Sequence, residues 1–219
     1  MTKQKKNDLM AGITLFGVFL MWTIMVRCVD VKPVGQNGTD IGFAGINTWF
    51  HGLTGVHMWI YTVTDWLGLV PIAVCMCFGV LGLVQLINRK SLFKVDRDII
   101  VLGIYYLIVI FAYLFFEMVP INYRPIPIEG IMEASYPSST TLLVLSVMPT
   151  LMYQVRRRVK NKTMQTAIIY AGGLFAALMA LGRTVAGVHW LTDIIGSILL
   201  SFGLFMLYRF FATGRSDKN

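Results

Sequence analysis

Six long stretches of this 219-residue chain contain no charged residue. A helix that crosses a lipid bilayer needs about 20 predominantly apolar residues, and five of the stretches reach that length or nearly so. The last one does so only if it extends back through Trp190 and accommodates Asp193 inside the protein. We therefore expect an all-α, polytopic membrane protein with six transmembrane helices. The uncharged stretches are 9–26, 66–88, 99–116, 134–155, 163–182 and 194–208.

The composition excludes several other classes of protein. Hydrophobic residues make up 56% of the chain and charged residues only 14%, against about 25% charged in ordinary soluble domains. A soluble globular domain, a disordered chain and a disulfide scaffold are all excluded on this ground. The three cysteines, Cys28, Cys75 and Cys77, lack any metal-ligand spacing. The first stretch lacks a small-residue cleavage site, so we do not interpret it as a signal peptide.

The basic residues are distributed very unevenly between the two sides of a six-span topology. Fifteen of the 19 fall on one side, which the positive-inside rule assigns to the cytoplasm. Both termini are then cytoplasmic, with tails at 1–8 and 212–219 around a membrane domain at 9–211. The net charge of +8 is explained by topology, so no nucleic-acid partner is expected. The fifteen are Lys3, Lys5, Lys6, Arg89, Lys90, Lys94, Arg97, Arg156, Arg157, Arg158, Lys160, Lys162, Arg209, Arg215 and Lys218.

The expected outer side begins with a long connection at 27–65. Its second half is rich in aromatic residues, which suits a membrane interface or a short helix lying on the membrane. His51 and His57 lie in this part, and we interpret them as interfacial polar residues rather than ligands. The other outer connections, at 117–137 and 182–190, hold two basic residues, Arg124 and Arg183, each of which needs a local reason to be there.

Three short polar motifs lie in or beside those two connections. An Arg side chain presents a rigid fork of donors to phosphate oxygens, and a Pro-Ser-Ser turn at a helix start directs N–H groups and hydroxyls at an anion. His189 and Asp193 are four residues apart, hence on one face of a helix. An Asp can hold an imidazole in one tautomer, which frees the other nitrogen to attack. The motifs are Arg124-Pro125, residues 136–141 (Tyr-Pro-Ser-Ser-Thr-Thr) and residues 182–193 (Gly-Arg-Thr-Val-Ala-Gly-Val-His-Trp-Leu-Thr-Asp).

With these motifs the chain resembles the type 2 phosphatidic acid phosphatase superfamily, the membrane lipid phosphate phosphatases. That family's pattern is Lys-x6-Arg-Pro, then Pro-Ser-Gly-His, then Ser-Arg-x5-His-x3-Asp. The third motif matches at Arg183, His189 and Asp193 with the family's spacing. Arg124-Pro125 matches the end of the first motif and Pro137-Ser138 the start of the second. The resemblance covers roughly residues 60–210, with the motif-bearing part at 117–193.

The resemblance implies a role for each matching residue. His189 is the nucleophile that forms a phosphohistidine, and Asp193 orients it. Arg124 and Arg183 bind the phosphoryl oxygens and stabilise the charge of the transition state. The cradle is completed by Ser138, Ser139 and Thr140. No metal or other cofactor is implied; the expected partners are membrane lipids and a lipid phosphate or diphosphate substrate, bound at the outer face of the cell membrane. No oligomeric state is indicated.

Three positions depart from the family pattern. Glu117 stands in place of the first-motif Lys, Thr140 in place of the second-motif His, and Gly182 in place of the third-motif Ser. The family's His protonates the leaving oxygen, a task for which Thr has no useful pKa. Among these motif positions, the charges of Arg124 and Arg183 are cancelled by those of Glu117 and Asp193, which weakens the attraction for a phosphate dianion.

These departures leave three functions open. The favoured one is a lipid phosphatase, since the nucleophile and both arginines remain. The alternatives are a degenerate relative that binds a lipid headgroup without turnover, and a phosphotransferase that uses the same His189. Without a general acid, a diphosphate substrate is favoured, polyprenyl diphosphate being the natural class, because its leaving group is already a stable anion. Glu129 and Glu133 lie near the second motif; we interpret them as solvated loop carboxylates, although either could replace the missing acid.

Overall fold

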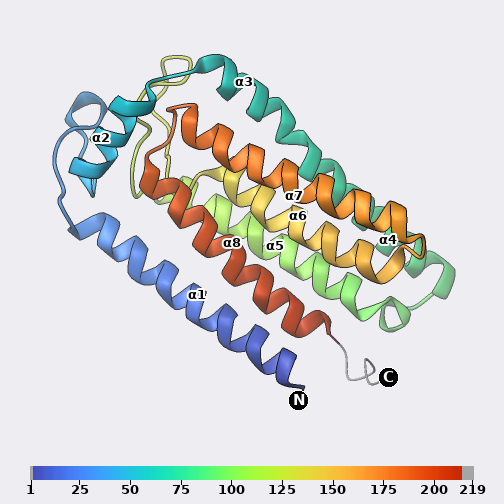
Figure 1. Cartoon of the computed structure of the whole chain (residues 1–219). Helices are drawn as coiled ribbons and strands as arrows, with labels where there is room; N and C mark the ends of the chain where they lie inside the picture. Colours follow the sequence, from blue (N-terminus) through green and yellow to red (C-terminus); the bar gives the residue numbers. More distant parts are fainter. Residues whose placement is uncertain (1, 214–219) are drawn as a thin grey trace.

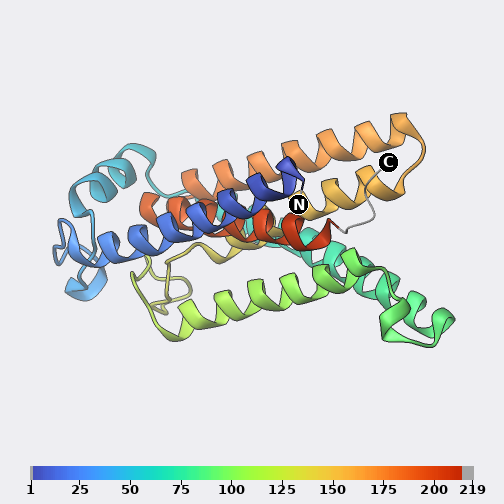
Figure 2. The same ribbon diagram turned by 90° about the horizontal axis from the view of Figure 1, so that it is seen from below.

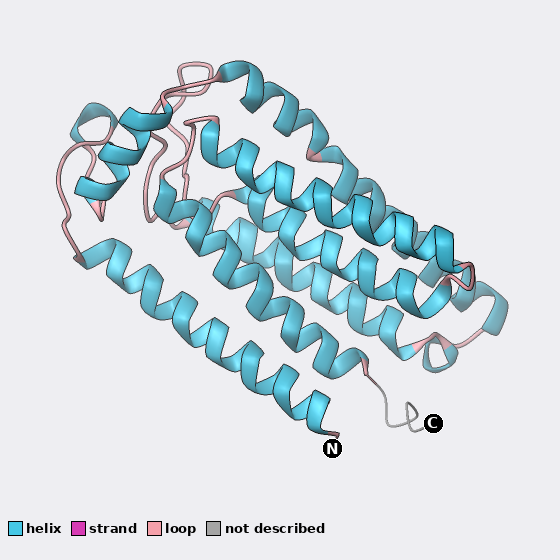
Figure 3. Ribbon diagram, viewed as in Figure 1, coloured by secondary structure: helices cyan, strands magenta, loops and turns pink. Residues whose placement is uncertain are grey.

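The computed structural model describes residues 2–213, and in that range the chain consists of helices joined by loops, without a β-strand (Figures 1 and 3). Six of the helices are long and four are short. The short helices are η1 (Gln36–Gly38), α2 (Ala44–Thr54), α3 (Met58–Leu67) and η2 (Leu92–Lys94). Most of the expected C-terminal tail, including Arg215 and Lys218, lies outside the described residues. The long helices are α1 (Lys3–Cys28), α4 (Leu69–Arg89), α5 (Arg97–Met118), α6 (Ser139–Arg158), α7 (Lys162–Val185) and α8 (Leu191–Ala212).

Each uncharged stretch of the sequence lies mostly within one long helix, although the stretch 134–155 begins five residues before α6. Five helical segments of the described chain are long and apolar enough to cross a membrane: α1, Met58–Arg89, α5, α7 and α8. The chain is thus a multi-pass membrane protein. The remaining long helix, α6, buries polar side chains such as Ser146, Thr150 and Gln154, so it is less apolar than its neighbours. Six spans therefore remain a prediction.

The helices divide into inner and outer ones. Of the buried residues that lie within helices, most belong to α6 and α8, whereas Pro71 is the only buried residue of α4. Outer helices instead expose large apolar side chains, such as Met76 and Leu83 of α4. This pattern suits helices that are solvated by lipid on one side and by protein on the other. Seen from below, α5 and α7 lie on opposite sides of α8 (Figure 2).

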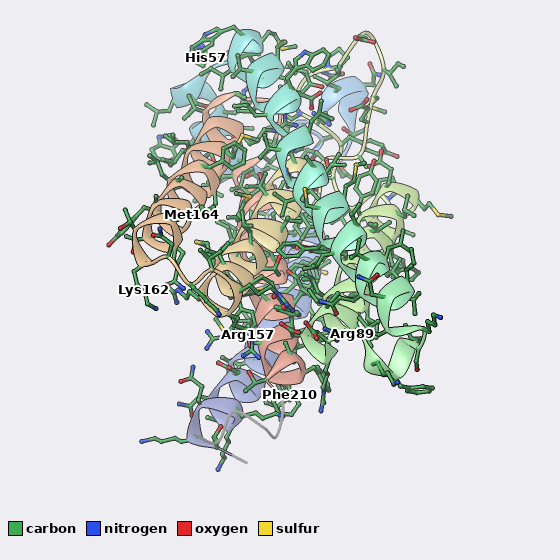
Figure 4. The ribbon with its side chains drawn as sticks, turned by 90° about the vertical axis from the view of Figure 1, so that its right-hand side faces the viewer. His57, Arg89, Arg157, Lys162, Met164 and Phe210 are labelled. Atoms are coloured by element: carbon green, nitrogen blue, oxygen red, sulfur yellow. The ribbon has the colours of Figure 1, made fainter. Side chains whose placement is uncertain are left out.

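The bundle has two distinct ends. We call one the loop end: it carries α2, the start of α3 and the connections 119–138 and 186–190. The other, the terminal end, carries the beginning of α1, the end of α8 and the connections 90–96 and 159–161 (Figure 1). Figure 4 labels His57 near the loop end and Arg157, Lys162 and Phe210 toward the terminal end.

A charged network ties the connections together at the terminal end. Arg158 donates to Asp96 at 2.9 Å and to both carboxylate oxygens of Asp98 at 2.9 Å. Arg89 donates to Asp96 at 2.7 Å. Hydrogen bonds from Arg89 first, and then from Arg158 and Gln85, lower the pKa of Asp96 to about 2. The network joins the α4–α5 connection to the end of α6.

The structure corrects two boundaries drawn from the sequence. The segment 27–65 was expected to be one long connection, but Met58 begins α3, which continues through Gly68 into α4. The charge of Asp65 was the reason for beginning the uncharged stretch at residue 66. In the structure Asp65 lies within α3, and its carboxylate is paired with Arg183 at 3.6 Å. At the other boundary, α1 begins at Lys3, so most of the segment expected as an N-terminal tail is helical.

A candidate active site at the loop end

A short antiparallel pairing brings four polar side chains to one face of the connection 119–138. Arg124 N donates to Glu133 O at 3.1 Å, and Ser135 N donates to Asn122 O at 2.9 Å. Alternate residues of an extended segment point to the same side, and directly opposed residues share a face. Asn122, Arg124, Glu133 and Ser135 therefore share one face, while Tyr123 and Ala134, which form the bridge between the two segments, point to the other.

The candidate nucleophile, His189, lies in the tight connection between α7 and α8 and is 4% exposed. Gly187 makes the turn with a φ of 72°, and a side chain there would collide with the carbonyl of Gly55, so glycine is required. His51 of α2 donates from Nε2 to Gly187 O at 3.1 Å, and the backbone N–H of His57 donates to Ala186 O at 3.0 Å. Both histidines thus hold this connection in place.

The neighbours of His189 fix its tautomer. Its Nδ1 lies 3.1 Å from Ser135 O, and since a carbonyl only accepts, Nδ1 must carry the proton. Its Nε2 lies 3.3 Å from a guanidinium nitrogen of Arg183, and since a guanidinium only donates, Nε2 presents a lone pair. Burial, reinforced by the charges of Arg183 and Arg124, lowers the pKa of His189 well below its ordinary value of 6.5. The ring is therefore neutral, with Nε2 facing the arginines.

Asp193, which is fully buried, contacts this arrangement indirectly. The sequence spacing suggested that it would hold the imidazole itself, but its Oδ2 lies 3.9 Å from Nδ1 of His189, beyond hydrogen-bonding distance. Its carboxylate accepts instead from Ser135 Oγ at 2.7 Å, Trp190 N at 2.8 Å and Asn122 Nδ2 at 3.3 Å. Three donors suit an ionised, acceptor-only carboxylate. Asp193 therefore holds Ser135, whose carbonyl holds His189.

Two guanidinium groups, those of Arg124 and Arg183, lie beside His189, and both are almost completely buried. Within the described residues, Nε and one terminal nitrogen of Arg124, and Nε of Arg183, have no hydrogen-bond partner. Buried donors are normally satisfied, so these unpaired N–H groups indicate a place for an anion. The centroid of the Tyr61 ring lies 4.9 Å from Cζ of Arg183 and 6.0 Å from Cζ of Arg124. The two guanidinium groups and the ring therefore form one cluster.

Helix α3 supplies residues that the sequence motifs did not reveal. Besides Tyr61, it brings Thr64 Oγ1 to 3.5 Å from Arg183 and Asp65 to 3.6 Å from the same nitrogen of Arg183. The three residues are spaced to lie on one face of a helix, which is the only sequence signal that could have identified them. A Cβ atom on Gly182 would lie 2.8 Å from the methyl group of Thr64. The absence of a side chain at position 182 thus makes room for Thr64.

The second motif forms the beginning of α6. Ser138 is buried and is the N-cap residue; its hydroxyl lies 3.0 Å from that of Thr141, and its carbonyl accepts from Ser197 at 2.9 Å. The N–H of Ser138 donates to Asp193 O at 3.3 Å, which ties α6 to α8 beside the nucleophile. Ser139 and Thr140 are half-buried and line a groove. Their role in holding phosphate stays a prediction.

The carboxylate that pairs with Arg124 is Glu133, whose Oε2 lies 3.0 Å from a terminal guanidinium nitrogen. The expectation that Glu133 is simply a solvated loop carboxylate is therefore wrong. Glu117, in the last turn of α5, is exposed, and it makes no hydrogen bond or ion pair with any described residue. In the structure Arg124 therefore forms its ion pair with Glu133 and not with Glu117.

An apolar groove of about 550 Å³ begins beside this site and runs between α4, α5 and α6. Asp65, Ser139 and Thr140 line its polar end. Its other walls consist mainly of aliphatic side chains, and it reaches Cys75 and Tyr106 farther down the bundle. The aliphatic lining includes Leu69, Ile72, Val109, Ile110, Leu143 and Val147.

Comparisons with known proteins identify the family of the chain and support its fold. Residues 99–215, more than half of the chain, match the family model of the PAP2 superfamily. The fold resembles the crystal structure of the first transmembrane PAP2-type phosphatidylglycerolphosphate phosphatase from Bacillus subtilis. The TM-score is 0.60 at 18% sequence identity, and the match covers 90% of this chain and 94% of that one. A sequence comparison with curated proteins gives no match. Helix α3 and its three site residues lie outside the family-model match.

Proposed function

Because the chain belongs to the PAP2 superfamily, we propose that it is a membrane lipid phosphatase that removes phosphate from a lipid phosphate or diphosphate headgroup through a phosphohistidine. The observation that carries the proposal is the state of His189. Its neutral ring presents the Nε2 lone pair to a cluster of buried guanidinium groups that have unpaired donors.

The proposed reaction has two steps. In the first, Nε2 of His189 attacks phosphorus, the bond from phosphorus to the lipid oxygen breaks, and that oxygen takes a proton from a general acid in the site. Arg124 and Arg183 donate to the phosphoryl oxygens, whose charge they stabilise in the transition state. In the second, water gives a proton to the same group, now acting as a base, and attacks phosphorus; the P–N bond breaks, and inorganic phosphate leaves.

Asp193 has an electrostatic role in this scheme. When the lone pair of His189 is used to form the P–N bond, the ring becomes positively charged while Nδ1 keeps its proton. The carbonyl of Ser135 accepts that proton's hydrogen bond, and the Asp193 carboxylate, 3.9 Å away, stabilises the positive charge. Direct hydrogen bonding between the two residues is not required for this contribution.

A lipid substrate is supported by the groove beside the site. Its polar end contains residues of the second motif, and its apolar walls would accommodate a hydrocarbon chain. We further propose six membrane spans, with the loop end at the outer face of the cell membrane. The basic residues gathered toward the terminal end support this orientation by the positive-inside rule.

Phosphate release from the purified full-length protein in detergent tests the proposal, with lipid monophosphates and lipid diphosphates as substrates. We expect release by the wild type and a loss of about a thousandfold or more in His189→Ala, because a covalent nucleophile has no substitute. His57→Ala removes another loop-end histidine side chain but keeps the backbone N–H that donates to Ala186 O, so this matched control should stay within a few-fold. Release that survives in His189→Ala would contradict the phosphohistidine route.

The alternatives give different results in the same assay. A degenerate relative would bind a lipid phosphate without releasing phosphate. A phosphotransferase would accumulate label on His189 from a labelled lipid phosphate and pass it to an acceptor other than water.

A further inference from the structure

A carboxylate of the protein itself, that of Glu133, occupies part of the anion-binding cluster. Glu133 Oε2 lies 3.0 Å from Arg124, whose side chain is 9% exposed, while the Glu133 side chain is 36% exposed. A guanidinium binds a carboxylate and a phosphate through the same donors. An incoming phosphate therefore competes with Glu133 for Arg124.

The backbone pairing places Glu133 close to the nucleophile. Glu133 and Ser135 point to the same face of one extended segment and are about 6.6 Å apart along it. The carbonyl of Ser135 holds His189. On the other side, Ala134 and Glu117 line a small recess together with Ser139 of the second motif. Glu133 is thus two residues from Ser135, on the same face, and Ser135 accepts the hydrogen bond of His189.

The charges around Glu133 change when an anion binds. Its charged neighbours are Arg124 in its own connection, Arg183 of α7 and Glu117 of α5, and its phenolic neighbours are Tyr61 and Tyr113. A bound phosphate takes donors of Arg124 away from Glu133 and adds negative charge beside two carboxylates. Both changes favour the protonated form of a carboxyl group.

We propose that Glu133 is the general acid and base of the reaction, which takes the role left vacant at Thr140. This inference rests on the proposed function. Before the headgroup binds, Glu133 pairs with Arg124; one proton is taken up together with the headgroup and is carried by Glu133. As His189 Nε2 forms its bond to phosphorus, Glu133 gives this proton to the leaving lipid oxygen. In the second step the Glu133 carboxylate accepts a proton from the attacking water, which leaves Nε2 with its lone pair.

An acid at this position changes the substrate expected from the sequence. Without a proton donor, the site favoured a diphosphate, whose leaving group needs no proton. With Glu133 as the acid, an alkyl monophosphate can also be cleaved, because the departing alkoxide is protonated as it forms.

Substrates with different leaving groups test this role. We compare Glu133→Gln with the wild type in single-turnover release of the leaving group, which reports the first step alone, from a lipid alkyl monophosphate and from 4-nitrophenyl phosphate, whose phenolate leaves without protonation. Loss of a general acid should slow release of the alkyl group by about 10²–10⁴-fold and release of the aryl group by about tenfold or less. Glu129→Gln, in the same connection, is the matched control and should change neither. Equal losses on both substrates, or faster turnover of both, would overturn the proposal.

Proton uptake provides a second measurement that needs no turnover. Calorimetric titration with orthovanadate in two buffers of different ionisation enthalpy gives the number of protons bound with the anion. We expect about one proton fewer for Glu133→Gln than for the wild type, and no difference between the two overturns the role of Glu133. If the wild type cleaves no substrate at all, the proposed function fails, whereas this titration still decides whether Glu133 is protonated.

Discussion

Thr64 of α3 fills the space in which a side chain at position 182 of α7 would lie. Its methyl group is 2.8 Å from the position of a Cβ atom on Gly182, and its hydroxyl donates to Ile60 O at 2.7 Å and Tyr61 O at 3.0 Å, so its rotamer is fixed. The departure of this chain from the family's Ser at 182 is thus coupled to a residue more than a hundred positions earlier in the sequence.

This coupling predicts a compensating pair of substitutions. Gly182→Ser should destabilise the protein by about 1–3 kcal/mol through overpacking, and adding Thr64→Ala should restore most of that loss. Thermal unfolding of the two single variants and the double variant in detergent measures the coupling. Losses that simply add would show that the two positions do not compete for space.

The indirect contact between Asp193 and His189 predicts non-additive kinetics. Ser135→Ala removes a donor to Asp193 but keeps the carbonyl that holds Nδ1, so kcat should fall by about tenfold. Asp193→Asn should cost considerably more. The double variant should be no worse than Asp193→Asn, because the hydroxyl of Ser135 acts through that carboxylate. Ser146→Ala, a buried serine of α6, is the control. A double variant with fully additive losses would contradict this linkage.

The lowered pKa of His189 predicts the acid side of the pH profile. A histidine whose pKa is depressed stays neutral as pH falls through the ordinary value of 6.5 and becomes protonated only at lower pH. Only the neutral ring can attack. Protonation of His189 should therefore not lower kcat/KM until the pH is below 6.5. NMR titration of labelled histidine should show His189 as the ring that resists protonation. A midpoint at or above 6.5 would be inconsistent with the buried, arginine-flanked environment.

The proposed orientation predicts which loops are accessible from outside. In a variant without native cysteines, Ile131→Cys should react with a membrane-impermeant maleimide on intact cells, since residue 131 is exposed at the loop end. Lys160→Cys, at the terminal end, should react only after permeabilisation. The reverse pattern would place the site on the cytoplasmic side.

The charged network at the terminal end predicts a contribution to stability. Arg158→Met removes its hydrogen bonds to Asp96 and Asp98 and should lower the free energy of unfolding by about 1–3 kcal/mol; Lys160→Met is the control. Because the pKa of Asp96 is lowered to about 2, its share of this stability is present above its ordinary value of 3.8 and is lost as pH falls toward 2. Equal midpoints for Arg158→Met and Lys160→Met would refute the contribution.

The sequence predicted the long helices well, because uncharged length is a local pattern. The expectation that His189 and Asp193 share one face of a helix was wrong, because α8 begins only at Leu191 and the two side chains lie 3.9 Å apart without a hydrogen bond. Asp65 was misplaced because a charge inside an apolar helix is tolerated only when a partner such as Arg183 lies nearby, and that partner is distant in sequence. Whether those helices all cross the membrane depends on α6, whose polar residues are buried by tertiary packing.

The remaining site residues were missed because they depend on pairing between two irregular segments. Asn122 and Ser135 carry no motif, and only their alternation with Arg124 and Glu133 along the two segments connects them to the site. Such alternation over three residues is too short to stand out in a sequence. The contact between Glu133 and Arg124 likewise depends on the register of the pairing, which hydropathy does not encode.

The paired segments 122–124 and 133–135 keep four polar side chains on one face, and residues 125–132 form the tip that joins them. Within the tip, Ile128 is buried against Ala186 and Val188, beside His189. A slip of one residue in the pairing would turn one segment's side chains away from the site. Insertions and deletions in the tip are therefore compatible with the site only where they keep both the register of the pairing and the contacts of Ile128.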